Sequence, residues 1–252
     1  MEETNDSNAN NNSIIEFKNV YKSFEDNKVL IGINLTVFKG ENLVILGKSG
    51  SGKSVTIKCI VGLTKVNSGE ILVFGTDITK LHYEDLNKVR LKIGFLFQNG
   101  ALYDSMTVKQ NLEFTLIHHN KNLSLDEIEY AIKEALEDVG LLEVIHKMPS
   151  ELSGGMKKRI GLARALINAP EIILYDEPTS GLDTITSREI DELILKIQKK
   201  RKTTSIIITH DLACARITGN RIMIIKDGAI NAIGSYEELK NSTDIWVRSF
   251  FK

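Results

Sequence analysis

The sequence predicts an α/β fold with a parallel sheet at its core, an N-terminal antiparallel β subdomain and a helical insertion subdomain. Two changes of pattern along the chain support this prediction. Short β-branched runs give way after residue 46 to strands that alternate with helices, and strand patterns stop between residues 98 and 153. Of the 252 residues, 42 % are hydrophobic and 26 % are charged, which is the composition of a globular chain that forms a sizeable core.

Short β-branched runs open the chain at Ile14–Val20, Ile33–Phe38 and Asn42–Leu46. Glu25-Asp26-Asn27 and Lys39-Gly40 separate them as turns, so we expect an antiparallel start. Later strands are expected at Ile71–Phe74, Ile93–Phe97, Ile172–Tyr175, Ser205–Thr209 and Arg221–Ile225.

Two of the later strands differ from the others in their pattern. Ile172–Tyr175 and Ser205–Thr209 are continuously apolar rather than alternating. Such runs are typical of parallel strands that are covered on both faces. We therefore expect both strands at the centre of the sheet.

Helix signals dominate the insertion and return at the end of the chain. Ser124 is an expected N-cap for a helix at Leu125–Val139, which Gly140 ends. Asp227-Gly228 is an expected hairpin turn, and Ser235–Lys240 a short capped helix.

Charge and composition exclude several classes of protein. Lys and Arg total 32 and Asp and Glu 33, a net charge of −1, which disfavours a general nucleic-acid binder. No apolar run reaches the roughly 18 residues of a bilayer span, and residues 1–13 do not resemble a secretory signal. Cys59 and Cys214 offer neither a disulfide framework nor metal-ligand spacing, so we expect the reducing cytosol.

A phosphate-binding pattern lies between an expected strand and an expected helix. Gly47-Lys48-Ser49-Gly50-Ser51-Gly52-Lys53-Ser54 matches G-x-x-x-x-G-K-[ST]. The glycines let backbone N–H groups converge on phosphate oxygens, and the helix start adds partial positive charge. Lys53 is placed for the β- and γ-phosphates and the Ser54 hydroxyl for Mg²⁺. This pattern predicts a P-loop NTPase core rather than an accidental Gly-rich turn.

Two carboxylates follow the apolar strand at Ile172–Tyr175. Open α/β sheets place ligands at the carboxyl ends of their strands, where Asp176 can reach the Mg²⁺ shell. Glu177 can accept a proton from an attacking water or orient it. The alternative is a solvated acidic turn.

A second candidate anion site lies at the start of another helix. Ser153 is an expected N-cap, and Gly154 and Gly155 permit close approach of a ligand. Because one nucleotide does not need two such cradles, we infer that this one serves a nucleotide bound by another copy of the chain. The alternative is a helix cap with a flexible Gly-Gly approach.

Taken together, these motifs resemble the ATP-binding cassette (ABC) family of ATPases over nearly the whole chain from Ile14 onward. The residues that carry the resemblance are Gly47–Ser54, Gln98, Leu152–Gly155, Leu174–Glu177, Ser180–Asp183 and His210.

By this resemblance the cofactors are ATP and Mg²⁺. Gln98 is the glutamine that senses Mg²⁺, Phe24 stacks on adenine, and His210 is a switch histidine at the γ-phosphate. Ser153–Gly155 closes on the nucleotide of a partner copy. Ser180–Asp183 crosses the interface of a homodimer, and Asp183 is the nucleotide-binding residue of this segment. The catalytic set is then Glu177, His210 and Gln98, and the metal set Ser54, Gln98 and Asp176.

Several of these residues have structural alternatives. Phe24 could pack within its strand, Gln98 could be a polar strand end, and His210 could be a structural histidine. Lys48 is expected to point to solvent, with an added contact to the phosphates of the nucleotide as the alternative. Met156 stands where the family commonly has Gln, a departure that leaves the anion-binding groups unchanged.

The resemblance also indicates a transporter subunit. Only 54 residues lie between Gln98 and Ser153, too few for the coiled-coil arm of the chromosome-maintenance ATPases of this superfamily. Translation-associated members usually carry two cassettes, whereas this chain has one and lacks a basic patch for RNA. We therefore expect an ATPase subunit that drives separate transmembrane permease subunits and binds no nucleic acid.

Two segments resemble the Mla-type, or MCE-associated, phospholipid transport ATPases: Phe95–Val108 and Met148–Met156. This implies phospholipid movement between inner and outer membranes, with an MCE-type lipid-binding protein and an accessory cytoplasmic subunit as further partners. The chain would sit on the cytoplasmic face of the inner membrane through the permease. The alternatives are the ATPase of a lipoprotein-release or solute-import system, or a non-transport ABC ATPase.

The expected organisation follows from these assignments. Residues 1–13 form a disordered tail, and 14–243 form the ABC ATPase domain with its helical subdomain at about 99–165. Residues 244–252 are unusually apolar for a chain end. They either cover their own domain or contact a second copy or an accessory subunit.

Overall fold

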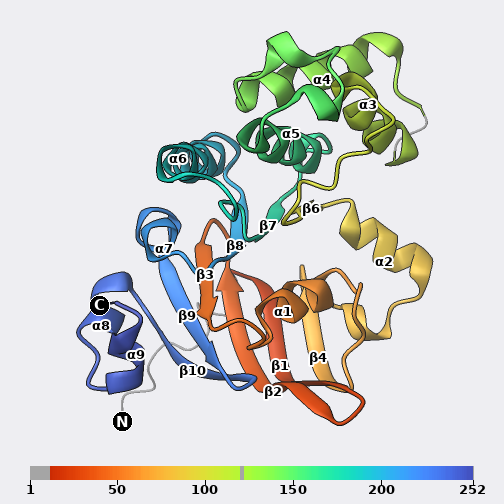
Figure 1. The fold of residues 1–252 in the computed structure, drawn as a ribbon. Coiled ribbons are helices and arrows are strands. Elements are labelled where there is room, and N and C mark those ends of the chain that lie inside the picture. Colours follow the sequence, from red (N-terminus) through yellow and green to blue (C-terminus); the bar gives the residue numbers. More distant parts are fainter. Residues whose placement is uncertain (1–11, 120–121, 252) are drawn as a thin grey trace, which may run out of the picture.

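The structure, a computed structural model, describes residues 12–119 and 122–251 and contains two sheets (Figure 1). One is four-stranded in the order β2-β1-β4-β5, and the other is six-stranded in the order β10-β9-β3-β8-β7-β6. The strands are β1 (Ser13–Phe24), β2 (Asn27–Phe38), β3 (Asn42–Gly47), β4 (Ser68–Val73), β5 (Thr76–Asp77), β6 (Ile93–Leu96), β7 (Ile172–Asp176), β8 (Thr204–Ile208), β9 (Arg221–Lys226) and β10 (Ala229–Gly234).

Helices surround the larger sheet and form a separate group at the top of Figure 1, where α3, α4 and α5 lie. They are α1 (Lys53–Ile60), α2 (Tyr83–Arg90), α3 (Val108–His119), α4 (Leu125–Asp138), α5 (Gly154–Leu166), α6 (Thr184–Arg201), α7 (Leu212–Thr218), α8 (Tyr236–Lys240) and α9 (Ile245–Ser249). Short 3₁₀ turns lie at Ile78–Lys80, Leu142–Val144 and Pro149–Glu151.

The six-stranded sheet is buried on both faces, and its strands β9, β3, β8, β7 and β6 run parallel. Along β3, Val44 and Leu46 belong to the core shared with the helices, whereas Leu43 and Ile45 belong to the core shared with the four-stranded sheet. Because successive side chains point to opposite faces, such a strand needs apolar residues at every position. The central places predicted for β7 and β8 are confirmed.

The N-terminal antiparallel sheet is confirmed, but its first two strands are longer than the sequence pattern indicated. Phe24 pairs with Asn27 across a tight turn, so Asn27 belongs to β2 rather than to the turn. Glu25 adopts the left-handed conformation there, with φ of 51°. Cross-strand hydrogen bonds hold the polar ends of both strands extended, which the alternating apolar pattern alone did not indicate.

The expected turns and caps beyond the first sheet are confirmed. Ser124 and Glu127 form a capping box at the start of α4, and Ser235 caps α8 in the same way. Asp227 and Gly228 have φ of 48° and 80° and join β9 to β10. Helices α2, α6 and α7 were not placed by the sequence pattern. Polar residues interrupt their apolar positions, and α2 buries none of its residues.

The chain end packs on its own domain. Val247 of α9 is buried, and Trp246 and Phe251 pack against the helix-side core. Of the alternatives for residues 244–252, the structure supports coverage of the domain itself, while Ile245 stays exposed. The tail expected at residues 1–13 lies outside the described residues up to residue 11, and Ser13 already begins β1.

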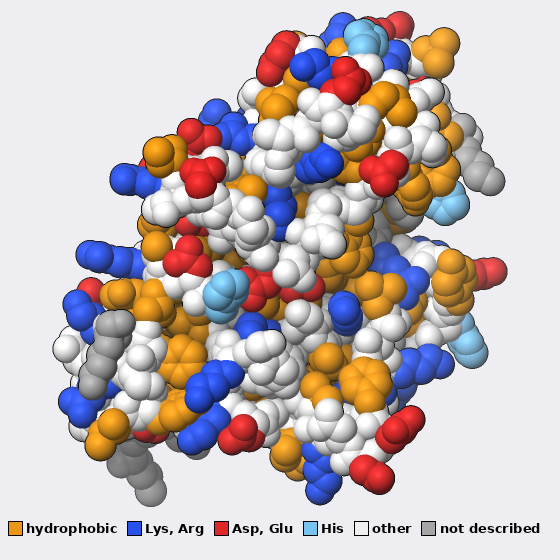
Figure 2. Space-filling view, viewed as in Figure 1, with side chains coloured by type: hydrophobic (Ala, Val, Ile, Leu, Met, Phe, Trp, Pro, Cys, Tyr) orange, Lys and Arg blue, Asp and Glu red, His pale blue; other side chains and the backbone are white. Residues whose placement is uncertain are grey.

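In the part of the chain that the structure describes, no helix is both long and apolar enough for a bilayer span. On the face shown in Figure 2, Lys and Arg side chains are interspersed with Asp and Glu. The near-zero net charge therefore reflects local mixing on this face rather than two large patches of opposite sign.

The packing of α9 can be tested with Val247→Ala. Loss of two buried methyl groups should lower the free energy of unfolding by about 1–3 kcal/mol, measured by urea denaturation. Ile245→Ala removes an exposed side chain from the same helix and should change stability by no more than about 0.5 kcal/mol. Equal effects of the two substitutions would contradict the docking of this helix.

Candidate functional site

The phosphate-binding pattern forms the loop between β3 and α1, and its glycines are required by the backbone. Gly50 and Gly52 have φ of 78° and 103°, a region that residues with a Cβ rarely adopt. A Cβ on Gly47 would lie 2.7 Å from the carbonyl oxygen of Ile225 on β9. The loop therefore holds a backbone path that larger residues would distort.

Donor groups in this loop are poised for an anion. Buried Lys53 donates from Nζ to the carbonyl oxygens of Gly47 and Lys48, at 2.8 and 3.1 Å. Burial lowers the pKa of Lys53, opposed by the charges of Glu177 and Asp176. No side chain caps the start of α1, which leaves its first N–H groups facing the loop. Such an arrangement suits a bound phosphate.

Ser54 and Asp176 bring the loop and β7 together. The Ser54 hydroxyl donates to Asp176 Oδ1 at 2.9 Å, and Asp176 ends β7 as a buried carboxylate. Among the described residues, no group of three or more His, Cys, Asp or Glu could hold a metal by itself. One hydroxyl and one carboxylate fit Mg²⁺, which usually keeps waters and shares phosphate oxygens with its nucleotide.

Glu177 and His210 form a direct pair beside Asp176. The Glu177 backbone adopts φ of 51° and donates its N–H to Ile208 at 2.9 Å. Its carboxylate Oε2 lies 2.7 Å from His210 Nδ1, with side-chain exposures of 14 % for Glu177 and 70 % for His210. That exposure argues against a structural histidine. The pair faces the open carboxyl edge of the sheet.

Gln98 follows β6 at the same edge and is exposed. Its Nε2 donates to Ser180 Oγ at 3.3 Å, which connects β6 to the segment after β7. The polar strand end of the alternative interpretation is wrong, because β6 ends at Leu96 and Gln98 lies in the following loop.

The second glycine motif belongs to a different part of the molecule. Ser153 caps α5 by accepting from the Met156 N–H at 3.3 Å, as predicted. A Cβ on Gly155 would lie 2.6 Å from Thr186 of α6, whereas Gly154 is exposed. Gly47 and Gly52 instead lie against β9 and β2. The fold therefore places the two glycine motifs against different elements.

Asp183 serves as the N-cap of α6. One carboxylate oxygen accepts from the N–H groups of Ile185 and Thr186, each at 3.0 Å. The other accepts from the Thr186 hydroxyl at 2.6 Å, and this bond is the main reason that the pKa of Asp183 lies below its ordinary value. Within the single chain Asp183 thus has a capping function.

Phe24 and Lys48 are both exposed side chains. Phe24 is 48 % exposed and carries Lys22 Nζ 4.6 Å from its ring centroid, so the strand-packing alternative is wrong. Exposed Lys48 lines a hollow of about 370 Å³ together with Asn27 and Trp246. The aromatic face of Phe24 is therefore available to a planar ligand.

Sequence reasoning missed two buried charged residues near this edge. Lys158 lies on α5 and Asp191 on α6, and both appear in the sequence as ordinary members of a polar helix. Burial raises the pKa of Asp191 to about 6, with Cys214 as a hydrogen-bonding neighbour. Asp191 shares a hollow of about 690 Å³ with Ser180 and His210. Only the packing of α5, α6 and α7 reveals these positions.

Comparison with known proteins identifies the family of the chain. The pattern of the ABC transporter family matches residues 30–180. The chain is 39 % identical over 236 residues to the probable ribonucleotide transport ATP-binding protein mkl of Mycobacterium leprae, covering 94 % of this chain and 68 % of that one. It is 38 % identical to the methionine import ATP-binding protein MetN of Clostridium acetobutylicum, covering 90 % and 70 %.

Solved structures show the same fold. A dimeric ATP-binding cassette, in a post-hydrolysis state bound to ADP and Pi, superposes with a TM-score of 0.81 at 35 % identity, covering 88 % of this chain and 98 % of that one. The protein cbiO1 from Clostridium perfringens, part of the ABC transporter complex cbiONQ, gives a TM-score of 0.85 at 30 % identity, covering 96 % of both.

Fold and phosphate loop together define an ATP-binding P-loop ATPase. The chain belongs to the ABC transporter family, as an ATP-hydrolysing cassette.

Asp191 makes stability depend on pH. The pKa of Asp191 is 3.8 in its ordinary state and about 6 in the folded chain. Between pH 3.8 and about pH 6 the unfolded chain therefore loses a proton that folded Asp191 retains, so stability falls as pH rises through this window. Asn cannot ionise, so the free energy of unfolding of Asp191→Asn should rise relative to that of the wild type between about pH 4 and pH 7, by on the order of 3 kcal/mol. Urea denaturation at each pH measures it.

Glu143→Gln, which changes an exposed carboxylate outside α6, provides the control and should follow the wild-type pH profile. An Asp191→Asn profile parallel to the wild type would show that this carboxyl ionises alike in both states.

Proposed function

We propose that the chain hydrolyses ATP as a homodimer that drives a membrane permease. The observation that carries the hydrolytic role is the convergence of Lys53, Ser54, Asp176 and the Glu177–His210 pair at one edge of the parallel sheet. These residues supply a cation, two oxygens that suit a metal and a candidate base, which supports the assignment. ATP hydrolysis needs each of these groups.

Each side chain then has a role that its position supports. Lys53 exchanges its two carbonyl partners for the β- and γ-phosphates, and Ser54, Asp176 and Gln98 hold Mg²⁺. Bound Mg²⁺ neutralises charge that develops on the phosphates. Glu177 orients the attacking water and accepts its proton, while His210 holds the Glu177 carboxylate and faces the γ-phosphate.

Sharing of sites between two copies follows from the placement of the second glycine motif. Ser153–Gly155 presents helix N–H groups at the start of α5, packed on α6 rather than on the chain's own phosphate loop. In a head-to-tail dimer these groups reach the partner's γ-phosphate, Phe24 stacks on adenine and Asp183 lies at the crossing between copies. The dimeric cassette among the solved relatives supports this arrangement.

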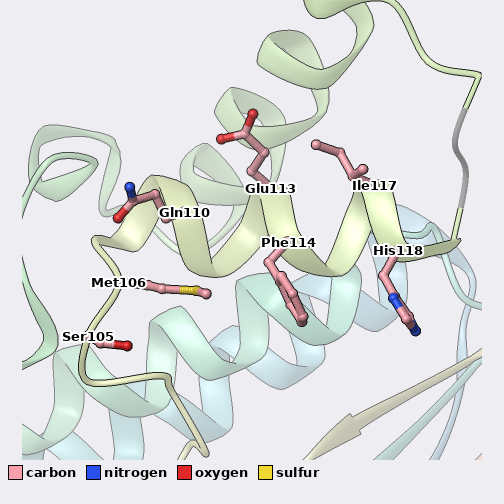
Figure 3. A pocket seen from close by; sticks show the side chains of 7 residues that line it. All are labelled: Ser105, Met106, Gln110, Glu113, Phe114, Ile117 and His118. Atoms are coloured by element: carbon pink, nitrogen blue, oxygen red, sulfur yellow. The ribbon is translucent and has the colours of Figure 1, made fainter.

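The permease contact is proposed at an apolar hollow on α3. Met106, Phe114 and Ile117 line this hollow of about 660 Å³, and Phe114 and Ile117 are exposed. In Figure 3, Phe114 and His118 project from the same side of α3. Contiguous exposed apolar surface marks interaction sites. The membership of cbiO1 in a transporter complex supports a permease partner.

Phospholipid is the proposed cargo, moved between inner and outer membranes from the cytoplasmic face of the inner membrane. Support comes from the resemblance of Phe95–Val108 and Met148–Met156 to the Mla-type ATPases. On the same ground, we propose an MCE-type lipid-binding protein and an accessory cytoplasmic subunit as partners. Solute import is the second candidate, favoured by relatives named for methionine import and ribonucleotide transport.

The role of Glu177 predicts a separation of binding from turnover. Glu177→Gln should keep ATP affinity, measured by titration calorimetry, while the steady-state rate falls about 10²–10⁴-fold and the dimer persists with ATP on gel filtration. Glu171→Gln alters a carboxylate just before the opposite end of the same strand and should leave the rate unchanged. A Glu177→Gln rate within about threefold of wild type would refute the assigned role.

Purification from membranes tests partner and cargo together. The wild-type chain should recover a multi-span permease and glycerophospholipid, identified by mass spectrometry. Phe114→Ser should lose the permease yet bind ATP, because only the apolar hollow changes. Tyr130→Ser, an exposed aromatic on α4 outside the hollow, should keep it. Recovery of a permease with an amino acid or nucleotide instead of lipid would favour solute import.

A further inference from the structure

Helix α5 reaches the chain's own ATP site through one buried cation. Lys158 is 6 % exposed, and its Nζ donates to the backbone carbonyls of Gln98 and, at 3.0 Å, of Glu177. No carboxylate lies within ion-pair distance of this ammonium among the described residues. A buried ammonium is expensive unless its donors are satisfied, so these two carbonyls fix where the side chain lies.

The same face of α5 is clamped to the loop after Gln98. Arg164 donates to the carbonyl of Gly100 at 3.2 Å and to that of Ala101. A Cβ on Gly161 would lie 3.0 Å from the Gly100 Cα, so the two backbones touch. Because Lys158, Gly161 and Arg164 recur every third residue, they lie along one side of the helix. Helix α5 and residues 98–101 therefore move together.

The N-terminal end of α5 carries the glycine motif, Ser153–Gly155. Ser153 caps the first turn of α5, and Lys158 lies little more than one turn further along. Lys158 therefore connects the start of this helix directly to the Gln98 and Glu177 carbonyls. The Glu177 backbone is held at φ of 51° and its carboxylate at 2.7 Å from His210.

We propose that Lys158 is a positioning residue that couples helix α5 to Gln98 and Glu177 of its own chain. This inference rests on the shared sites of the proposed function. Lys158 does not touch the reacting atoms. It holds the water-orienting carboxylate and the Mg²⁺-side glutamine of its own site, although the first turn of its helix serves the partner's nucleotide.

A first test separates binding from turnover. Lys158→Met keeps the length of the side chain and removes its donors, so kcat should fall about tenfold or more while KM for ATP stays within about threefold. Lys157→Met, the adjacent and more exposed lysine, should leave both unchanged. If Lys158→Met does not fold, as judged by circular dichroism, Lys158→Gln takes its place.

The decisive test asks which of the two sites Lys158 serves. Dimers are purified through two different tags, with Lys158→Met and Ser153→Ala either in the same chain or in opposite chains. If Lys158 acts on its own Glu177, opposite chains place both changes in one site and leave the other intact. The same-chain dimer then damages both sites, and its turnover should be several-fold lower.

Lower turnover in the opposite-chain dimer, or equal turnover in the two dimers, would overturn the proposal. Lys158 would then support the glycine motif or the fold in general. Dimers that pair Lys53→Ala with Ser153→Ala provide a separate control on shared sites. Turnover should again be higher when the two changes are in opposite chains than when they are in the same chain. Equal turnover in that pair would contradict the shared sites themselves, and the coupling would fall with them.

Discussion

The alignment of parallel strands in the larger sheet is the constraint on which the site depends. Ile45 of β3 and Asp176 of β7 both pair with Ile208 of β8, so these strands end at the same height. Gly47 at the end of β3 and His210 just after β8 therefore lie at one edge of the sheet. Chemistry drawn from distant parts of the sequence is assembled there by backbone hydrogen bonds alone.

The charged side chains at this edge are only partly compensated by one another. Lys53 relies on two backbone carbonyls, while Asp176 accepts from a hydroxyl and Glu177 meets an imidazole. None of these is a complete ion pair between fixed opposite charges. Phosphate and Mg²⁺ would supply the missing partners at this edge.

A second layer of organisation lies in α5. Its first turn offers a cap and two glycines, and its inner side offers Lys158 and Arg164 to the loop after β6. Cations bonded to carbonyls connect elements without requiring a matching acidic residue, so the contact survives changes of charge at the ATP site. The helix is thereby tied to the core by backbone groups, while α3 and α4 lie above it in Figure 1.

Local sequence patterns were enough to predict the phosphate loop, the carboxylates after β7, the Ser153 cap and the Asp227-Gly228 hairpin, because each depends on a few adjacent residues. These patterns left open whether the carboxylates and the Ser153 cap bind a ligand. Only the tertiary structure decided the Glu177–His210 contact, the exposure of Phe24 and the burial of Lys158 and Asp191. The reason is physical: each of these depends on which strand or helix packs beside another, and no local pattern records a contact between residues that are far apart in the chain.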